Sequence, residues 1–111
     1  MNLHDVFDLM IEKNASDAFL RADSSLRLRI QMELETFAGI TFSEKDVQGI
    51  IGGLTKSWGE EDILEQKRGC DGAVNFDDKW RFRIGIFYQQ GRPALVVRKI
   101  NLQMLSFESL N

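Results

Sequence analysis

Apolar residues recur every three to four positions near the N-terminus, where Leu3, Val6, Phe7 and Met10 fall on one side of a helical wheel. This spacing predicts an amphipathic helix over residues 3–13. We expect the helix to end at Asn14, because asparagine tolerates the left-handed backbone found at helix ends.

The pattern then changes to alternation, which is typical of half-buried strands. Leu26, Leu28 and Ile30 alternate with Arg27 and Arg29, so the arginines should share the opposite face of one strand. The same criteria predict a short strand over 18–22, a turn over 23–25, a strand over 26–30 and a further short strand over 33–38.

Helical spacing returns in the middle of the chain. Ser43 is suited to cap a second helix, since its hydroxyl can accept from the amides of the first turn. An inner face is predicted for Val47, Ile50, Ile51 and Leu54. Gly49, Gly52 and Gly53 each weaken a helix by about 1 kcal/mol relative to alanine. We therefore expect this helix to be short and a third helix, capped by Ser57, to run to residue 67.

The last third of the chain reads as three strands, over residues 69–76, 80–90 and 94–100, joined by turns over 77–79 and 90–93. In the second of these strands Phe82, Ile84, Ile86 and Tyr88 alternate with residues that include Arg81 and Arg83. Pro93 lacks a donor and belongs at a strand start or an edge. The order of elements predicts an α+β fold, an antiparallel sheet covered on one face by helices.

With 111 residues the chain should form a single domain, 1–111. Its net charge of −3 argues against nucleic acid as the main partner. No apolar stretch approaches the length of a membrane span, and the first residues lack the order of a signal peptide, so a cytoplasmic location is expected.

Several patterns could carry chemistry, and each has a simpler structural interpretation. Cys70 and His4 could form a nucleophile–base pair, but a half-buried thiol and a helix histidine are the better interpretation. Lys56-Ser57 resembles the end of a P-loop, but the required glycines are missing, and we reject it. Carboxylates gather at Glu60, Glu61, Asp62 and Glu65 and at Asp77 and Asp78, where a solvated surface is expected. Trp58 and Trp80 are interpreted as core residues rather than as a small-molecule pocket.

Arginines are the less ordinary feature. Six of them lie in the expected strands or their turns: Arg27, Arg29, Arg81, Arg83, Arg92 and Arg98. Arg81 and Arg83 must share one face of one strand. A planar guanidinium suits bidentate binding of carboxylate or phosphate. On spacing alone, a polar sheet face with intrachain ion pairs is the favoured interpretation.

Five segments occur in a fixed order along nearly the whole chain. The first is Ala15-Ser16-Asp17-Ala18-Phe19-Leu20, followed by Arg29 and Leu34, and the second is Asp71-Gly72-Ala73-Val74-Asn75-Phe76. The next two begin Arg81-Phe82-Arg83-Ile84-Gly85 and Val97-Arg98-Lys99-Ile100, and the last is residues 105–110. In this order they resemble the N-terminal domain of twitching-motility PilT-type ATPases, namely its opening strands, its Asp-Phe-Ser-Phe, Arg-Phe-Arg-Val-Asn and Val-x-Arg-x-Ile strands, and the segment leading into the ATPase domain.

The chain also departs from the family pattern. Phe19 replaces a histidine, residues 23–26 replace a glycine and prolines, Met32 replaces a turn glycine, and Tyr88 replaces a frequent basic residue.

The resemblance implies a PAS-like domain that packs on the ATPase domain of a homo-hexameric motor for pilus retraction or secretion. The implied partner is the ATPase domain of the same or a neighbouring subunit, with peripheral association with an inner-membrane pilus or secretion platform. Within this family the domain helps to close over ATP, and by position Arg83, with Arg81 beside it, would reach the γ-phosphate. The P-loop that would hold ATP and Mg is absent from these 111 residues, so the chain alone is expected to bind no cofactor and not to hydrolyse ATP. Two alternatives stay open, namely a stand-alone PAS-like ligand-binding module and an adaptor for another motor's subunits.

Overall fold

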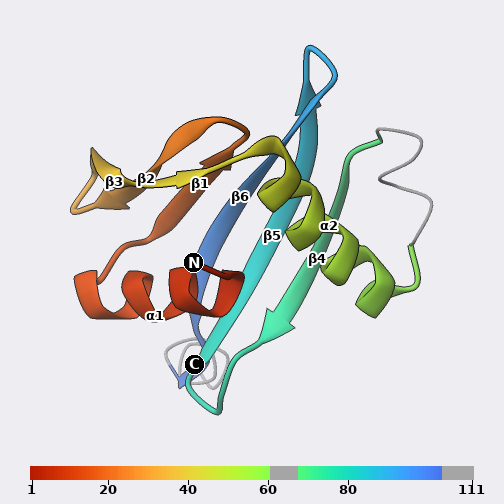
Figure 1. Ribbon diagram of the computed structural model, residues 1–111. Coiled ribbons are helices and arrows are strands. Elements are labelled where there is room, and N and C mark those ends of the chain that lie inside the picture. The colour runs from red at the N-terminus through yellow and green to blue at the C-terminus, as the bar shows by residue number, and fades with distance from the viewer. Residues whose placement is uncertain (61–67, 104–111) are drawn as a thin grey trace.

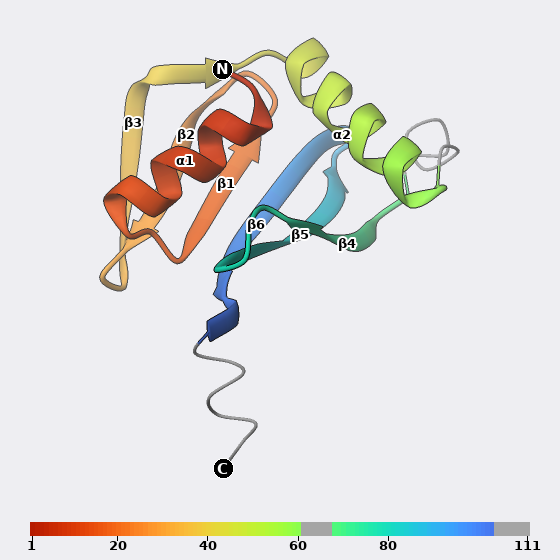
Figure 2. The ribbon, with the colours of Figure 1, turned by 90° about the horizontal axis from the view of Figure 1, so that it is seen from below.

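Six antiparallel strands form one sheet in the order β3-β2-β1-β6-β5-β4 (Figure 1). The computed structural model describes residues 1–60 and 68–103. Its strands are β1 (Asp17–Arg21), β2 (Ser24–Ile30), β3 (Glu33–Phe42), β4 (Cys70–Asn75), β5 (Trp80–Gln89) and β6 (Arg92–Asn101). Helices α1 (Leu3–Lys13) and α2 (Glu44–Trp58) lie on the same face of the sheet (Figure 2). The predicted α+β fold is confirmed.

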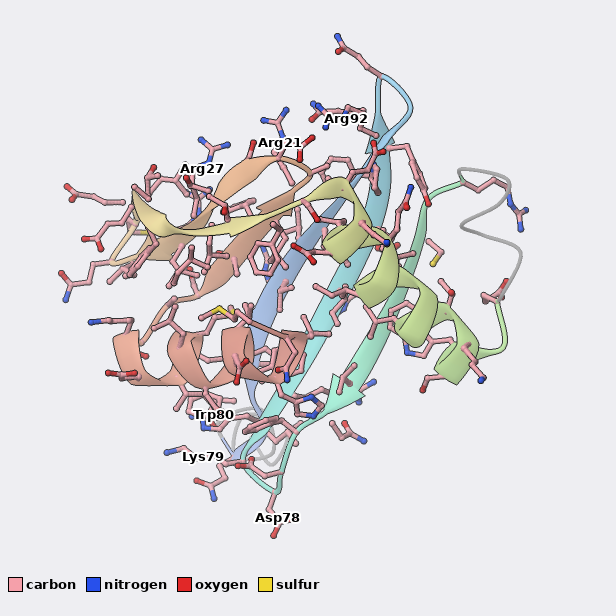
Figure 3. The ribbon with its side chains drawn as sticks, viewed as in Figure 1. Arg21, Arg27, Asp78, Lys79, Trp80 and Arg92 are labelled. Carbon is pink, nitrogen blue, oxygen red and sulfur yellow. The ribbon has the colours of Figure 1, made fainter. Side chains whose placement is uncertain are left out.

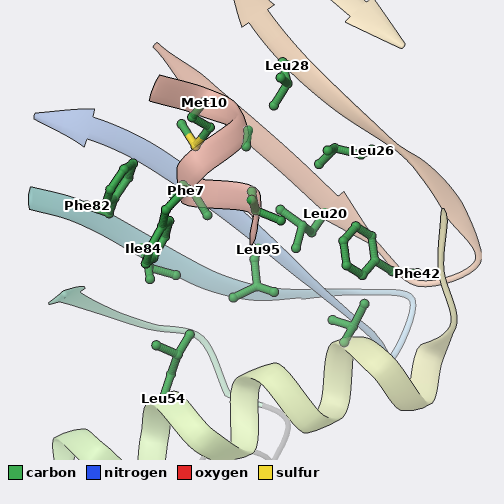
Figure 4. Packing of buried hydrophobic residues seen from close by; sticks show 14 of the residues in the cluster. Phe7, Met10, Leu20, Leu26, Leu28, Phe42, Leu54, Phe82, Ile84 and Leu95 are labelled. Atoms are coloured by element: carbon green, nitrogen blue, oxygen red, sulfur yellow. The ribbon is translucent and has the colours of Figure 1, made fainter. Parts of the chain in front are cut away.

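Helix α1 has the bounds that its sequence predicts. A capping box fixes its start, because Asp5 N donates to Asn2 Oδ1 and Asn2 N donates to Asp5 Oδ2, each at 2.9 Å. Asn14 ends it with a φ of 54°. The ring of Phe7 stacks on Phe82 of β5 at a centroid distance of 4.0 Å, which attaches the helix to the sheet (Figure 4).

Helix α2 is longer than its glycines suggest, and the prediction of a short helix was wrong. It runs through all three glycines to Trp58 and ends at Gly59, whose φ is 75°. Ser57 lies inside its last turn, so the expected third helix does not begin there, and residues 61–67 lie outside the described part of the chain. The buried side chains Val47, Ile51 and Leu54 each contribute about 1.5–3 kcal/mol, which outweighs the cost of the glycines.

Two strand boundaries also differ from expectation. β2 already begins at Ser24, because the β1–β2 turn is tight and Asp23 takes a φ of 56°. β3 extends to Phe42 instead of ending at residue 38. The β2–β3 register shifts between Ser25 and Leu26, so that residues 38–40 bulge before pairing resumes at Thr41. Phe42 is 2% exposed and returns the chain to the core.

The predicted β5–β6 hairpin forms, but its turn is shorter than the predicted turn over 90–93, so that β6 begins at Arg92 and not at residue 94. Its two-residue turn is Gln90–Gly91, with φ values of 53° and 78°. Pro93 lies opposite Tyr88 near the start of β6, beyond the last residue that pairs with β1, so its missing donor breaks no bond to β1. Within the described residues neither helix is long and apolar enough to cross a bilayer.

The two faces of the sheet have different chemistry. The face under the helices holds the buried core, in which Leu20, Leu28, Phe82, Ile84 and Leu95 are at most 1% exposed (Figure 4). The opposite face is not covered by either described helix (Figure 2). Residues that lie opposite each other on neighbouring strands share a face of the sheet. The arginines of β1, β2, β5 and β6 alternate with core residues along their strands, so the register places them on this open face.

Candidate functional site

The open side of the sheet, called the arginine face here, carries these residues: Arg21, Arg27, Arg29, Arg81, Arg83 and Arg98. One register row crosses four strands, in which Arg83 of β5 lies opposite Arg98 of β6, Arg98 opposite Asp17 of β1, and Asp17 opposite Arg29 of β2. Three guanidinium groups and one carboxylate are thus aligned across the sheet. The excess of cations makes this row a candidate binding site for an anion.

Arg83 and Arg98 line one shallow depression of about 290 Å³ on the arginine face. Gly85 lies in its floor, two residues along β5 from Arg83. A Cβ atom at Gly85 would lie 3.2 Å from Asp71 Oδ1 on the neighbouring strand β4. The absence of a side chain at Gly85 therefore leaves the depression open. The depression therefore offers two exposed guanidinium groups to a ligand approaching the open face.

Asp17 fixes one of these two arginines. It is 6% exposed, accepts from Arg98 Nε at 3.2 Å and from Ser16 Oγ at 2.7 Å, and its second oxygen lies 3.6 Å from Arg29 Nε. Both arginines are engaged through Nε. Among the described residues, these contacts leave the terminal nitrogens of Arg98 available to a ligand. Those nitrogens are the part of the fork that binds phosphate or carboxylate bidentately.

Arg81 and Arg83, the predicted site residues, are both exposed on the arginine face. Arg81 lies opposite Ile100, one pleat away from the Arg83–Arg98 pair. Within residues 1–60 and 68–103, neither forms an ion pair. The structure therefore leaves both side chains accessible from outside, as a contact with another polypeptide requires. Whether they touch a nucleotide stays a prediction.

Arg98 was missed as a site residue, although it lies in the Val-x-Arg-x-Ile motif. Arg92, in contrast, lies away from the row. It pairs with Asp23 and, at 3.4 Å, with Glu44, and these two carboxylates raise the pKa of Arg92 above its ordinary value. Figure 3 shows Arg92, Arg21 and Arg27 toward one end of the molecule and Trp80 at the other.

The structure separates Cys70 from His4. Cys70 begins β4, whereas the His4 ring lies 5.8 Å from the ring of Phe76, just beyond the other end of that strand. Five residues of extended chain span about 17 Å. Burial raises the pKa of the Cys70 thiol, which favours the unreactive form. The structural interpretation of both residues is supported.

The segment that resembles the end of a P-loop, Lys56-Ser57, lies inside helix α2, which agrees with our rejection of a P-loop. Just before it, Thr55 Oγ1 donates to Ile51 O at 2.9 Å within the same helix.

The carboxylate of Asp77 stabilises the β4–β5 turn. Its Oδ1 accepts from the backbone amides of Lys79 and Trp80 at 2.8 and 2.7 Å. In the described ranges no acidic, histidine or cysteine cluster could hold a metal ion. Glu61, Asp62 and Glu65 lie outside those ranges.

The two tryptophans do not share a pocket. Trp58 covers Gly72 and donates from Nε1 to Ala73 O at 3.2 Å. Trp80 is flanked by the amines of Lys79 and Lys99, at 5.1 and 4.6 Å from its ring. Burial, and then the charge of Lys79, lower the pKa of Lys99.

No protein-family model matches the chain. Among curated proteins, the chain is 24% identical over 110 residues to the type IV pilus ATPase PilU of Pseudomonas aeruginosa. The match covers 99% of this chain and 28% of the relative, so the chain spans well under a third of that protein's length.

Solved structures show the same fold. The crystal structure of the pilus retraction motor PilT with bound ADP matches 88% of this chain with a TM-score of 0.74 and 22% identity, over 29% of its own length. The ATPase DotB of Legionella pneumophila matches 88% of this chain with a TM-score of 0.70 and 14% identity, over 28% of its own length. The fold is that of the N-terminal domain of PilT-like motor ATPases. The resemblance to that domain found in the sequence is confirmed.

Proposed function

We propose that this chain acts as the N-terminal, non-catalytic domain of a PilT-like motor ATPase that serves type IV pili or secretion. It packs against an ATPase domain of the same or a neighbouring subunit in the cytoplasm and helps that domain to close over ATP with Mg. Hydrolysis then drives movement between the domains in a hexamer, which associates peripherally with an inner-membrane platform.

The accessibility of Arg83 and Arg98 is the observation that carries the proposal. Two guanidinium groups from neighbouring strands border one depression on the only sheet face that the described helices leave open. A donor that reaches a phosphate only when two domains close can stabilise the charge of phosphoryl transfer. A true arginine finger is worth about 10³–10⁵ in rate.

Arg81 takes the outer position in this arrangement. It shares the face with Arg83 but lies outside the 290 Å³ depression. Its charge attracts the phosphates as the domains approach, whereas Arg83 and Arg98 make the closer contact. Substitution of Arg81 should therefore have a smaller effect than substitution of Arg83.

Measuring ATP hydrolysis by the full-length motor tests the proposal. Arg83→Ala should lower kcat by at least about tenfold, and Arg83→Lys should restore little of it because the fork geometry is lost. Arg27→Ala is the matched control, since Arg27 lies on the arginine face but not in the depression. Unchanged turnover in Arg83→Ala with intact hexamers would contradict the proposal.

A further inference from the structure

The β2–β3 turn presents apolar side chains to solvent. Within the described residues the exposed large hydrophobic side chains are Met1, Met32 and Leu34. Met32, in the turn, is 89% exposed and Leu34, at the start of β3, is 45% exposed. Leu34 lies opposite Arg29 and therefore on the arginine face. Exposed apolar side chains that gather on one face indicate a contact surface.

The backbone of this turn is also unfavourable for its residues. Gln31 and Met32 have φ values of 52° and 71°, in the left-handed region where two-residue hairpin turns usually place asparagine and glycine. A glycine at position 32 would remove both the strain and the exposed side chain. The sequence has methionine at this position instead, which benefits neither solubility nor the turn.

Met32 borders a second depression on the arginine face, of about 460 Å³, together with Phe19, Arg29, Val96 and Arg98. The Arg29 guanidinium lies over the Phe19 ring at 5.6 Å from its centre. Val96 and Arg98 also line the depression that holds Arg83. The two depressions are therefore adjacent parts of one surface. The first is lined by two arginines and Asp71, and the second is both cationic and apolar.

We propose that this second depression, with Met32 as its anchor, docks a protein surface on which an apolar recess is flanked by carboxylates. Charge complementarity argues for this partner chemistry, because Arg29 and Arg98 border the depression and its one carboxylate, Asp17, is already engaged. The partner is the ATPase domain that presents the nucleotide to Arg83, so the inference rests on the proposed function. Met32 and Leu34 would then hold the arginine face in register with the phosphates.

Hydrogen–deuterium exchange of the full-length motor, with and without the non-hydrolysable analogue AMPPNP, tests this inference. Amides of residues 27–36 should exchange more slowly once AMPPNP closes the domains. Met32→Gln, which keeps the length but not the apolar character, should weaken that protection by roughly tenfold, as loss of an interface anchor does. Met32→Leu should retain it. Gln31→Gly alters the same turn but keeps Met32, and it should also retain the protection.

Each outcome decides between the two proposals. If Arg83→Ala slows hydrolysis but AMPPNP leaves the exchange of residues 27–36 unchanged, the function stands and the docking surface is overturned. If protection appears and depends on Met32 while Arg83→Ala is fully active, docking stands and the nucleotide role fails. Protection that grows with protein concentration in the 111-residue chain alone would assign the surface to self-association and overturn the inference.

Discussion

Arg83 and Arg98 lie directly opposite each other on β5 and β6, both exposed on the same face. Like charges in this relationship repel, because the Cβ atoms of such cross-strand pairs are only about 4.5–5.5 Å apart. Asp17 compensates the charge of Arg98 at 3.2 Å, and no described carboxylate forms an ion pair with Arg83. The repulsion lowers the stability of the folded domain, and it leaves the charge of Arg83 available to an external anion.

Substitution of the two arginines should change stability in opposite directions. Arg83→Gln should raise the free energy of unfolding by about 0.2–1 kcal/mol, because it removes the cross-strand repulsion. Arg98→Gln should lower it by about 1–3 kcal/mol, because the buried Asp17 loses its closest cation. Urea unfolding of the 111-residue chain at low and high salt measures both. A loss of stability in Arg83→Gln would show that Arg83 has an intrachain role.

Gly72 and Gly49 form a second matched pair. A Cβ at Gly72 would lie 2.3 Å from the ring of Trp58, so Gly72→Ala must displace that ring or β4 and should cost about 1–3 kcal/mol. Nothing lies within 4 Å of a Cβ at Gly49, and Gly49→Ala should stabilise α2 by about 1 kcal/mol. Tryptophan fluorescence during unfolding reports both variants. A shifted native spectrum is expected for Gly72→Ala only.

The capping box of α2 gives stability a defined pH dependence. Hydrogen bonds from the backbone amide and then the side chain of Ser43 lower the pKa of Asp46. Since the folded pKa is depressed, its stabilising contribution is present above the unfolded pKa and is lost as pH falls through the folded value, below about pH 4.

Asp46→Asn should therefore be less stable than the wild type at pH 6, and the difference should shrink below pH 4. Thermal unfolding across this pH range measures the difference. Asp78→Asn, in the exposed β4–β5 turn, is the control and should show no comparable change. A difference that persists unchanged at pH 2.5 would mean that the charge of Asp46 does not contribute.

The elements that could be predicted from sequence are those whose signals are local. Helix α1 was placed correctly because periodicity and the end at Asn14 lie within the helix itself. Helix α2 was predicted too short because its glycines are visible in the sequence, whereas the burial of Val47 and Ile51 against distant strands is not. The bulge at residues 38–40 depends on where β2 and β3 resume pairing, which no local pattern indicates.

The same distinction applies to the site. The i, i+2 spacing was enough to put Arg81 and Arg83 on one face. Arg98 became part of the site only through the β5–β6 register, which depends on the two-residue turn at Gln90–Gly91. The row from Arg83 to Arg29 joins strands that are far apart in the chain, so spacing along the sequence could not reveal it.

Met32→Gly should separate stability from docking. Glycine adopts the left-handed backbone at this position without the penalty of about 1–2 kcal/mol that other residues incur, although the unfolded chain gains entropy. The net result should be a free energy of unfolding raised by up to about 1 kcal/mol. In the full-length motor the same variant should close less readily over AMPPNP and show a raised KM for ATP. A domain that becomes more stable while the motor becomes less active is the result expected if the Met32 side chain contacts a partner. If KM is unchanged, Met32 has no part in the contact.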